Sequence, residues 1–365
     1  MKRELRSGYT TGACAAAAAK GAALMLVCQR LVNEVTIDLP GGRSVSFQLH
    51  NQVFSDEEAS CHVLKDAGDD PDITNGAEIK ATVAWRPVCI SVETLNNDNK
   101  ILISGGIGIG KVTKPGLAIP PGEWAINPVP RQMIREAVDA VTTEFKIEPH
   151  SALSIVLSIP DGEERAKRTL NARLGIIGGL SILGTTGIVR PISAKAWTDT
   201  IGAAVAVAKA CNCKNIVFST GRTSELAAQK HLPDLPEEAF IMMGDHVAFA
   251  LKASLISGYT QPIIACQFAK MLKIACGYEN THAAASALDL AVLYGWAESA
   301  KLLPAKLAVI SQANTAREIA VTTGFDEQLM NLVADRARLA AARHSDGIQM
   351  QPLLCGYDNS VVLWR

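Results

Sequence analysis

The stretch SGYTTGACAAAAAKGA, residues 7–22, predicts how the first part of the chain folds. Thr10 and Thr11 stand just before Gly12 and a run of alanines. A threonine side chain can accept hydrogen bonds from the free N–H groups at a helix start, and alanine has the highest helix propensity. The stretch therefore predicts a helix that begins at these threonines and continues to about Arg30.

The predicted helix is apolar without having the character of a membrane segment. Residues 13–28 are mostly alanine, and Lys20 lies in the middle of the run. Alanine transfers weakly into lipid and a central charge is costly there, so neither a spanning helix nor a secretory signal is expected. We therefore expect a cytoplasmic protein.

The composition is that of a folded protein with more than one domain. The chain has 365 residues, of which 48% are hydrophobic and 19% are charged. This supplies enough apolar side chains for a sizeable core, and the length favours two domains. The net charge of -1 argues against a general nucleic-acid binder, although a local basic patch for a small anion stays open.

Nine cysteines are scattered along the chain, an odd number without a CxxC pair. This usage favours reduced thiols in a cytoplasmic enzyme over a disulfide framework. Cys211 and Cys213 are close in sequence, but no neighbouring His or Cys completes a zinc-type set. We therefore expect no metal site, and we interpret these cysteines as buried small residues.

Short alternating segments follow the predicted helix. They contain Val, Ile and Thr and are separated by turns rich in Gly, Pro, Asn and Asp, which is typical of strands. The predicted strands cover residues 34–39, 44–49, 78–84, 88–94, 100–104 and 151–159, and a helix is predicted over 131–144. Residues 1–175 are therefore expected to form an α+β domain with a mainly antiparallel sheet.

The pattern changes near residue 175, where strands and helices begin to alternate. Strands are predicted over 180–189, 215–219, 240–243 and 261–266, and helices over 197–211, 223–230, 246–256 and 269–276. Helices at 282–299, 313–322 and 327–344 and a strand-like end at 360–364 complete the prediction. Such alternation is typical of a doubly wound parallel sheet, so residues 176–365 are expected to form a Rossmann-like α/β domain.

The glycine-rich block GGIGIGKVTKPGL, residues 105–117, matches the first part of a nucleotide P-loop. Val112 occupies the position where that loop needs Ser or Thr, and Pro115 prevents the helix that should follow. The G-x-G-x-G spacing also differs from the dinucleotide fingerprint. A nucleotide-binding loop is therefore disfavoured.

Two interpretations of this block stay open. It is either a strand-to-strand loop or a loop that brings backbone N–H groups close to a ligand. We favour the ligand-binding loop, because Lys111 and Lys114 lie beside its glycines. The glycines concerned are Gly106, Gly108 and Gly110.

The acidic segment GDDPDITNGAEI, residues 68–79, gathers Asp69, Asp70 and Asp72. The favoured interpretation is a turn stabilised by Asp and Asn side chains. A calcium loop is not expected, because the bidentate Glu is missing at the required distance. The functional alternative is a carboxylate in or near an active cleft.

Several predicted strand ends carry glycines and hydroxyls, and parallel-sheet folds bind ligands beyond the carboxyl ends of their strands. GLSILGTTGIVRPIS, residues 179–193, is expected to end the first parallel strand, and STGRTSE, residues 219–225, ends the next. Arg222 could meet an anion at a helix start. Tight packing explains the first loop nearly as well, and a capping turn explains the second. Asp245, at another strand end, is interpreted as a helix cap.

The late block AKMLKIACGYENTHAAAS, residues 269–286, places Lys270 and Lys273 on one helix face. Thr281 is interpreted as the cap of a following helix that His282 opens. Solvated lysines and a structural histidine are the favoured interpretation, and His282 as a site residue is the alternative. The chain has no GxSxG, HExxH or kinase motif.

Together these blocks resemble the cobalt-precorrin-5B C(1)-methyltransferase family of anaerobic cobalamin synthesis. The resemblance covers nearly the whole chain, and the blocks stand in the family's order and spacing. They are residues 7–22, 105–117, GEWAINPVPRQMI (122–134), TLNARLGIIGGLSILGTTGIVRPIS (169–193) and the late Asn-Thr-His (280–282). The late block departs from the family pattern, since residues 266–269 replace a glycine-rich turn and Ala283 replaces a serine.

The resemblance implies S-adenosylmethionine as the methyl donor and a cobalt-containing, carboxylate-rich tetrapyrrole as the acceptor. Cobalt then enters as part of the substrate, and the product is cobalt-precorrin-6A. Other enzymes of the corrin pathway stay open as partners, whereas nucleic-acid and membrane partners are not expected. The resemblance does not set the oligomeric state.

The site residues expected for this reaction fall into three groups. Cationic side chains and backbone N–H groups should bind the acceptor's carboxylates. These substrate-binding residues are Thr10, Thr11, Gly12, Gly106, Gly108, Gly110, Lys111, Lys114, Arg131, Arg190 and Arg222. The donor-binding residues are Gly184, Thr185, Thr186, Gly187, Thr220 and Gly221. The catalytic candidates are Asp70, Glu123 and His282; either carboxylate would hold the donor's ribose or its cation.

Two other functions stay open. A nucleotide-dependent oxidoreductase or kinase would use residues 105–110 as a phosphate loop. A non-catalytic carrier would bind the tetrapyrrole without methylating it.

Overall fold

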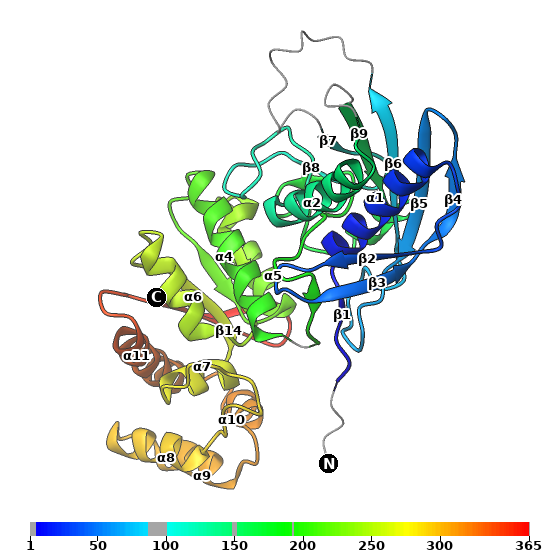
Figure 1. Ribbon diagram of the computed structural model, residues 1–365. Helices are drawn as coiled ribbons and strands as arrows, with labels where there is room; N and C mark the ends of the chain where they lie inside the picture. The colour runs from blue at the N-terminus through cyan, green and yellow to red at the C-terminus, as the bar shows by residue number, and fades with distance from the viewer. Residues whose placement is uncertain (1–4, 87–100, 148–151, 192, 365) are drawn as a thin grey trace. The chain divides into compact units, whose positions relative to one another are not determined.

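The computed structural model describes residues 5–86, 101–147, 152–191 and 193–364. The chain divides into two compact units, Met1–Ser193 and Ala194–Arg365, each with its own core (Figure 1). The strand predicted over 88–94 lies outside the described residues. Because the division falls after Ser193, residues 176–193 belong to the first unit rather than to the second domain expected from the sequence.

The first unit is built on a five-stranded sheet with the order β4-β5-β6-β9-β7. Its strands are β4 (His50–Phe54), β5 (Glu58–Leu64), β6 (Glu78–Arg86), β9 (Ala152–Ser158) and β7 (Ile101–Gly105). Neighbours are antiparallel except β9 and β7, which are parallel. Strands β4 and β5 were not predicted: β4 is mostly polar, and β5 alternates polar and apolar residues but has a single β-branched residue, Val63.

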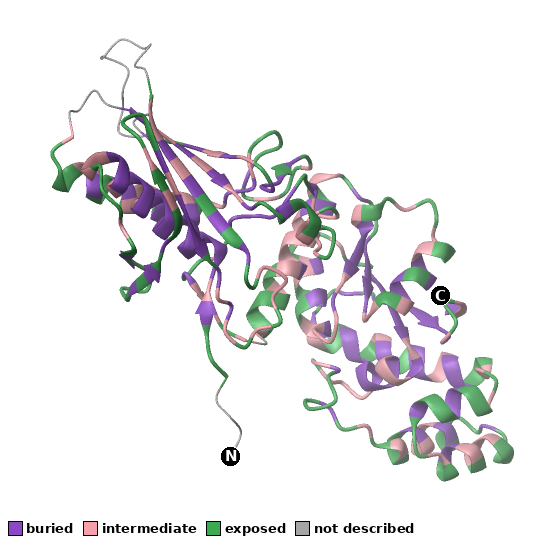
Figure 2. Ribbon diagram, turned by 90° about the vertical axis from the view of Figure 1, so that its right-hand side faces the viewer, coloured by how far each residue is buried: buried purple, intermediate pink, exposed green. Residues whose placement is uncertain are grey.

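The alanine-rich helix α1 (Thr11–Cys28) is the centre of the first unit's core. It packs against β5, β6, helix α2 (Pro128–Glu144) and the hairpin of β2 (Glu34–Asp38) and β3 (Ser44–Gln48). It is long and apolar enough to cross a membrane, but 78% of the helix is buried inside the unit (Figure 2). Alanine suits this place because its small side chain lets strands and helices approach from several sides.

Two short strand pairs close the first unit. Strand β1 (Gly8–Tyr9) pairs with β11 (Ile188–Val189), and β8 (Lys111–Val112) pairs with β10 (Ile176–Ile177), both antiparallel. The first parallel strand predicted over 180–189 is therefore wrong. Only Ile188 and Val189 of that run form a strand, and Leu180 and Ile182 make single bridges to other segments of the unit. Periodicity alone does not separate these uses of a short apolar run. A short helix, α3 (Gly162–Ala166), follows β9.

The second unit is built on a sheet with the order β13-β12-β14-β15-β16. The strands are β12 (Val217–Ser219), β13 (Phe240–Met242), β14 (Ile263–Gln267), β15 (Gln351–Cys355) and β16 (Val361–Trp364). The first four are parallel, and β16 pairs with β15 in the antiparallel sense. These strands are buried, whereas many residues of the surrounding helices are exposed (Figure 2). Near-continuous apolar strands are expected for a parallel sheet covered on both faces.

Helices connect these strands and extend beyond them. They are α4 (Ala194–Ala210), α5 (Arg222–His231), the 3-10 helix η3 (Glu237–Ala239), α6 (Val247–Ile256), α7 (Phe268–Ala275), α8 (Leu290–Ser299), α9 (Pro304–Gln312), α10 (Ala316–Thr322) and α11 (Glu327–His344). The helix predicted to begin at His282 begins instead at Leu290, where Asp289 caps it. The intervening residues form turns, because side chains such as Asn280 bond to nearby backbone N–H groups.

Candidate functional site

The start of α1 is bonded within the first unit. The hydroxyl of Thr11 accepts a hydrogen bond from the Leu183 N–H at 2.9 Å, and the Gly12 N–H donates to the Leu183 carbonyl at 3.0 Å. Thr10 caps the helix by accepting from the Ala13 N–H at 3.2 Å. Both threonines are buried. The groups that we expected to offer to an anionic substrate are thus engaged by the protein itself.

The loop Gly184-Thr185-Thr186-Gly187 lies against this helix start. Gly184 has a φ of 124°, and an added Cβ would come within 2.5 Å of the Thr10 side chain. The Gly187 carbonyl accepts from the Thr10 N–H at 3.0 Å, while Thr185 and Thr186 are exposed. The loop therefore lies in the first unit and does not end a strand of the parallel sheet, which removes the reason for expecting the donor there.

The glycines of the 105–117 block let separate backbone segments meet. An added Cβ on Gly108, whose φ is 70°, would lie 1.9 Å from the Ile159 carbonyl oxygen. The N–H groups of Gly106 and Gly110 donate to carbonyls of other segments at 2.7 and 2.9 Å. Strand β8 follows the loop, where a P-loop needs a helix. These observations count against both a phosphate cradle and the ligand-binding role predicted for the three glycines.

Three predicted site residues of the first unit do come together. The Lys111 ammonium lies 4.5 Å from the centroid of the Trp124 ring, a cation–π contact. Arg131 donates from Nε to the Ile126 carbonyl at 2.9 Å, and its Nη2 lies 3.8 Å from Glu123 Oε2. Burial lowers the pKa of Arg131. Arg131 thus stabilises the backbone around Trp124 through hydrogen bonds to its carbonyls. Lys111 and Glu123 are exposed to solvent.

Lys114 and Arg190 are the other cations predicted in the first unit. The ammonium of Lys114 lies 3.4 Å from the Arg173 carbonyl. Arg190 follows β11 and is exposed. The Lys114 contact and the exposure of Arg190 are both compatible with a bound ligand, so both residues stay predicted substrate-binding residues.

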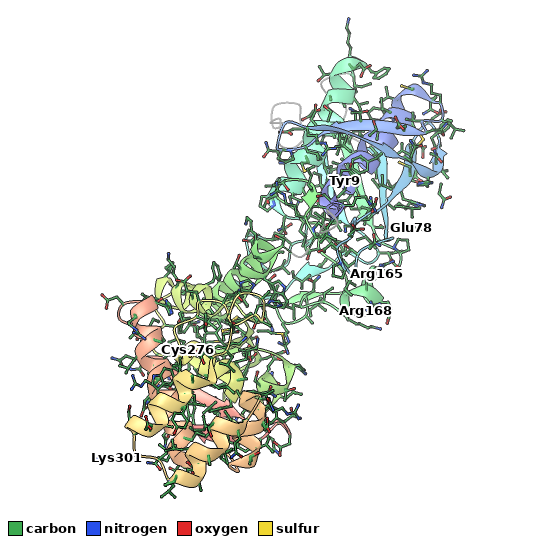
Figure 3. All side chains as sticks on the ribbon, turned by 90° about the horizontal axis from the view of Figure 1, so that it is seen from below. Tyr9, Glu78, Arg165, Arg168, Cys276 and Lys301 are labelled. Atoms are coloured by element: carbon green, nitrogen blue, oxygen red, sulfur yellow. The ribbon has the colours of Figure 1, made fainter. Side chains whose placement is uncertain are left out.

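The acidic segment forms the side-chain-stabilised turn that we favoured. Asp72 accepts from the Thr74 N–H at 2.7 Å and from the Lys65 ammonium at 2.6 Å. Burial alone would raise the pKa of Asp72, but the buried Lys65 beside it and the hydrogen bonds hold it below its usual range. Arg165, which is labelled in Figure 3, donates to the Ile73 carbonyl of this turn at 2.6 Å. Asp70 is half-buried in this turn, so its surroundings favour the structural interpretation over a catalytic one.

In the second unit, the strand order places a topological switch between β12 and β14. The chain passes from β12 to β13 on one side and then to β14 on the other, and such points bind ligands in open parallel sheets. Thr220 and Gly221 follow β12 here, and Gly221 begins α5. Among the described residues, nothing hydrogen-bonds to the buried hydroxyl of Ser219. Arg222, largely exposed, pairs at 2.6 Å with the fully buried Glu225.

A charged network follows the next strand along the chain, β13. The Asp245 carboxylate accepts from the Lys270 ammonium and from the Thr281 hydroxyl, the latter at 2.6 Å. Lys270 and Lys273 also donate to the Thr281 carbonyl oxygen, at 3.1 and 3.0 Å. The cap predicted for Asp245 is wrong: α6 begins after His246, and the Asp245 carboxylate is bonded by side chains. The prediction that Lys270 and Lys273 are solvated is wrong as well. The exposed fraction of Lys273 is 9%.

The pKa values of this network are displaced. Burial alone would raise the pKa of Asp245, but hydrogen bonds from Lys270 and Thr281 hold it below its usual range. Burial, together with the charge of Lys270, lowers the pKa of Lys273. His282 is exposed next to Thr281, and its Nδ1 accepts from the Ala284 N–H at 3.2 Å. Perturbed titrating groups at strand ends are a mark of functional sites.

An aromatic pair adjoins this network. The rings of Trp197 on α4 and His246, next to Asp245, stack with centroids 6.4 Å apart and planes inclined by 30°. The exposed fraction of Trp197 is 46%, which is large for tryptophan in a folded unit. Sequence reasoning missed this pair, although Gly244-Asp245-His246 at a predicted strand end was a usable signal.

The second unit also has a shallow pocket of about 470 Å³. Its lining includes Gln261, Arg338, Met350 and Gln351. Gln261, Met350 and Gln351 stand at the amino ends of β14 and β15, the edge of the sheet away from the switch point, and Arg338 lies on α11. Parallel sheets bind ligands at the carboxyl edge, so the charged network and the residues after β12 form the better candidate.

Family comparisons agree across both units. The family model described as "CbiD" matches residues 1–191, and the model described as "CbiD, C-terminal domain" matches residues 280–365. Proteins from Pelobacter propionicus and Geobacter sulfurreducens are each 55% identical to this chain and are named cobalt-precorrin-5B C(1)-methyltransferase. The alignments cover 99% of this chain in both cases, and 97% and 98% of the two relatives.

A solved structure is also similar. It is the crystal structure of a cobalamin biosynthesis protein (cbiD) from Archaeoglobus fulgidus, with 29% sequence identity and a TM-score of 0.39. The match covers 73% of this chain and 78% of that one.

Proposed function

The chain belongs to the CbiD family, and on that premise we infer that it methylates C-1 of cobalt-precorrin-5B to give cobalt-precorrin-6A in anaerobic cobalamin synthesis. The observation that carries this inference is the 55% identity over 99% of the chain to relatives named for that reaction. S-adenosylmethionine is the methyl donor in this proposal, as is usual for a methyltransferase of small molecules.

The chemistry asks the protein mainly to position two ligands. Methyl transfer from a sulfonium is an in-line displacement, and the conjugated ring supplies the electron-rich carbon, so no covalent protein nucleophile is needed. We place the donor at the carboxyl edge of the second unit's sheet, treating that unit as Rossmann-like. Thr220 and Gly221 stand at the switch point, beside a Ser219 hydroxyl that has no hydrogen-bond partner in the part of the chain that the structure describes, and they support this placement.

The acceptor carries several acetate and propionate groups, which require cations. The exposed Lys111, lying over Trp124, offers both a charge and a flat ring to a tetrapyrrole. Lys114, Arg190 and Arg222 are proposed as further carboxylate contacts. Of the catalytic candidates, His282 has the most supportive surroundings, because it adjoins a displaced titrating network.

Mass spectrometry of the reaction tests the function. Incubation of the purified protein with S-adenosylmethionine and cobalt-precorrin-5B should add one methyl mass to the tetrapyrrole, and S-adenosylhomocysteine should suppress the gain. Donor labelled with a trideuteromethyl group should add the correspondingly heavier mass. No methyl gain with intact, folded protein would overturn the proposal.

The two rivals predict other outcomes. A nucleotide-dependent oxidoreductase or kinase predicts thermal stabilisation by NADPH or ATP but not by S-adenosylhomocysteine, and a carrier predicts tetrapyrrole binding without product. The packed glycines of residues 105–110 already weigh against the first. We also propose that the reaction takes place in the cytoplasm, in keeping with the free thiols of the described cysteines.

A further inference from the structure

The second unit contains a buried ammonium with few partners. Within the described part of the chain, Lys273 Nζ has one hydrogen-bond acceptor, the Thr281 carbonyl oxygen at 3.0 Å. An ammonium has three N–H donors, and Lys273 is nine-tenths buried. The Asp245 carboxylate acts on Lys273 electrostatically, but it is bonded by Lys270 and Thr281. The network therefore has two ammonium groups for one engaged carboxylate.

A charge held in this way is costly unless an anion joins it. Removing an ammonium from water without a paired anion and a full set of hydrogen bonds is unfavourable. The lowered pKa of Lys273, caused by burial and by Lys270, expresses the same strain. Both ammonium groups bond one carbonyl oxygen, so they are close enough for a single carboxylate to bridge them.

We propose that Lys270 and Lys273 form a binding site for a carboxylate of one of the enzyme's ligands. This inference rests on the proposed function and deepens it. Lys270 is partly exposed and gives the anion access, and Lys273 supplies the desolvated charge behind it. The backbone turn that carries Thr281 and His282 forms one wall of the site.

The neighbouring aromatic pair indicates what is attached to that carboxylate. Trp197 and His246 present a stacked, partly exposed ring surface next to Asp245. A carboxylate on a flexible arm attached to a flat ring system fits this combination. Two ligands of the proposed reaction have that chemistry: the methyl donor, through its amino-acid carboxylate, and the tetrapyrrole, through its acetate and propionate arms.

Paired probes separate these two sources in the wild-type protein. S-adenosylhomocysteine is compared with its decarboxylated form, S-(5′-adenosyl)-3-thiopropylamine, which keeps the amine and lacks only the carboxylate. A cobalt-corrin polycarboxylate is compared with the same ring after methyl esterification. Calorimetric titration should show at least tenfold tighter binding of the carboxylate-bearing member of one pair. Equal binding within both pairs would overturn the proposal without any variant.

Variants then assign the effect to the lysines. Lys273→Met keeps the length of the side chain and removes its charge, and Lys270→Met does the same at the mouth. Each variant should lower the affinity for the favoured carboxylate-bearing probe at least tenfold. The affinity for its carboxylate-free counterpart should stay within twofold of wild type. Lys252→Met, on an exposed position of α6, is the matched control and should change neither. If the variants lose affinity for the donor probe, the site binds the donor's carboxylate; if they lose affinity for the corrin probe, it binds the tetrapyrrole's carboxylate. If both lysine variants bind all probes as tightly as wild type does, the proposed site is wrong.

One measurement does not depend on folding of the variants. Acylation of Lys270 in the wild-type protein, mapped by mass spectrometry, should slow in the presence of the carboxylate-bearing probe and not of its counterpart. Equal acylation rates would count against the site. Methylated product is scored separately: product without carboxylate selectivity removes the site and keeps the function, whereas selectivity without product does the reverse.

Discussion

The two units use their strand ends and glycines in different ways. In the first unit, Gly108 and Gly184 stand where any side chain would collide with another segment, and the polar groups at the start of α1 are bonded internally. In the second unit, at the carboxyl edge of the sheet, the Ser219 hydroxyl has no hydrogen-bond partner among the described residues, the Lys273 ammonium is buried and Trp197 is exposed. The glycine loops of the first unit are filled by the protein's own backbone, whereas polar groups at the carboxyl edge of the second unit's sheet are not fully hydrogen-bonded by the described residues.

The difference separates two meanings of a glycine-rich motif. The blocks that identify the family most clearly, at residues 7–22 and 105–117, are mainly packing devices. The groups that suit ligand chemistry lie on less distinctive sequence, such as Asp245 and Lys273. We therefore infer that a recognisable glycine motif in this chain reflects a constrained backbone path, and that the proposed site is indicated instead by its unbalanced charges.

The largest effect is expected from Gly108→Ala in the first unit. The new Cβ would lie 1.9 Å from the Ile159 carbonyl oxygen, so the backbone must shift, with an expected loss of about 3 kcal/mol or more of unfolding free energy. Gly122→Ala is the matched control, because Gly122 also has a positive φ but open space around it. It should cost about 1 kcal/mol. Chemical denaturation measures both, and equal costs would contradict the packing role.

Asp245→Asn should weaken the second unit's network. The change removes the charge that pairs with Lys270 and acts electrostatically on Lys273, and we expect a loss of about 1–2 kcal/mol, since the Asp245–Lys270 pair is only partly buried. The largely exposed pair of Asp199 with Lys195 provides the control, and Asp199→Asn should cost less than about 0.5 kcal/mol. Urea unfolding compares the variants. A neutral Asp245→Asn would show that the network does not stabilise the folded unit.

Thr11→Val tests whether the start of α1 is structural. The variant leaves the Leu183 N–H without its acceptor inside the unit, which should cost about 1–2 kcal/mol. Thr185→Val, on the exposed part of the adjoining loop, should be close to neutral. Substrate KM should stay within twofold of wild type for Thr11→Val. A stable variant with a strongly raised KM would instead support the anion-binding role first expected for this residue.

The smallest expected effect is the pH dependence of the first unit's stability. Burial lowers the pKa of His62, opposed by Glu78 and reinforced by His50 and Lys80. The unfolded chain therefore binds a proton more readily than the folded unit, so stability is full above about pH 6.5 and falls as the pH drops below it. The melting temperature between pH 7.5 and 5.5 should decline less in His62→Gln than in wild type. His231→Gln, exposed in the second unit, should leave the slope unchanged.

Much of the fold could be predicted from local patterns. Helix α1, the run of α5, β13, α6, β14 and α7, and helix α11 at Glu327–His344 follow from apolar periodicity and from turn residues. The pairing of β1 with β11 could not be predicted, because it joins segments far apart in the sequence through only two residues each. A pairing that short has no sequence pattern of its own.

The site was harder to predict than the fold. Lys270 and Lys273 were visible on one helix face, but the sequence could not show that Thr281 folds back to bond both of them. Asp245 looked like a helix cap because caps and ion pairs use the same residue type at the same kind of position. Burial of a charge depends on tertiary packing, and no local pattern records it.

The closure of the first unit has a consequence for how the protein is made. Its first strand, Gly8–Tyr9, pairs with Ile188–Val189, so the unit is complete only when nearly all of its residues have left the ribosome. Synthesis at about 5–20 residues per second leaves the apolar helix α1 waiting for many seconds without the sheet that covers it. During that interval the apolar face of the helix is not yet covered. The alanines that make dense packing possible in the finished unit therefore depend on strands and a helix that are made later in the chain.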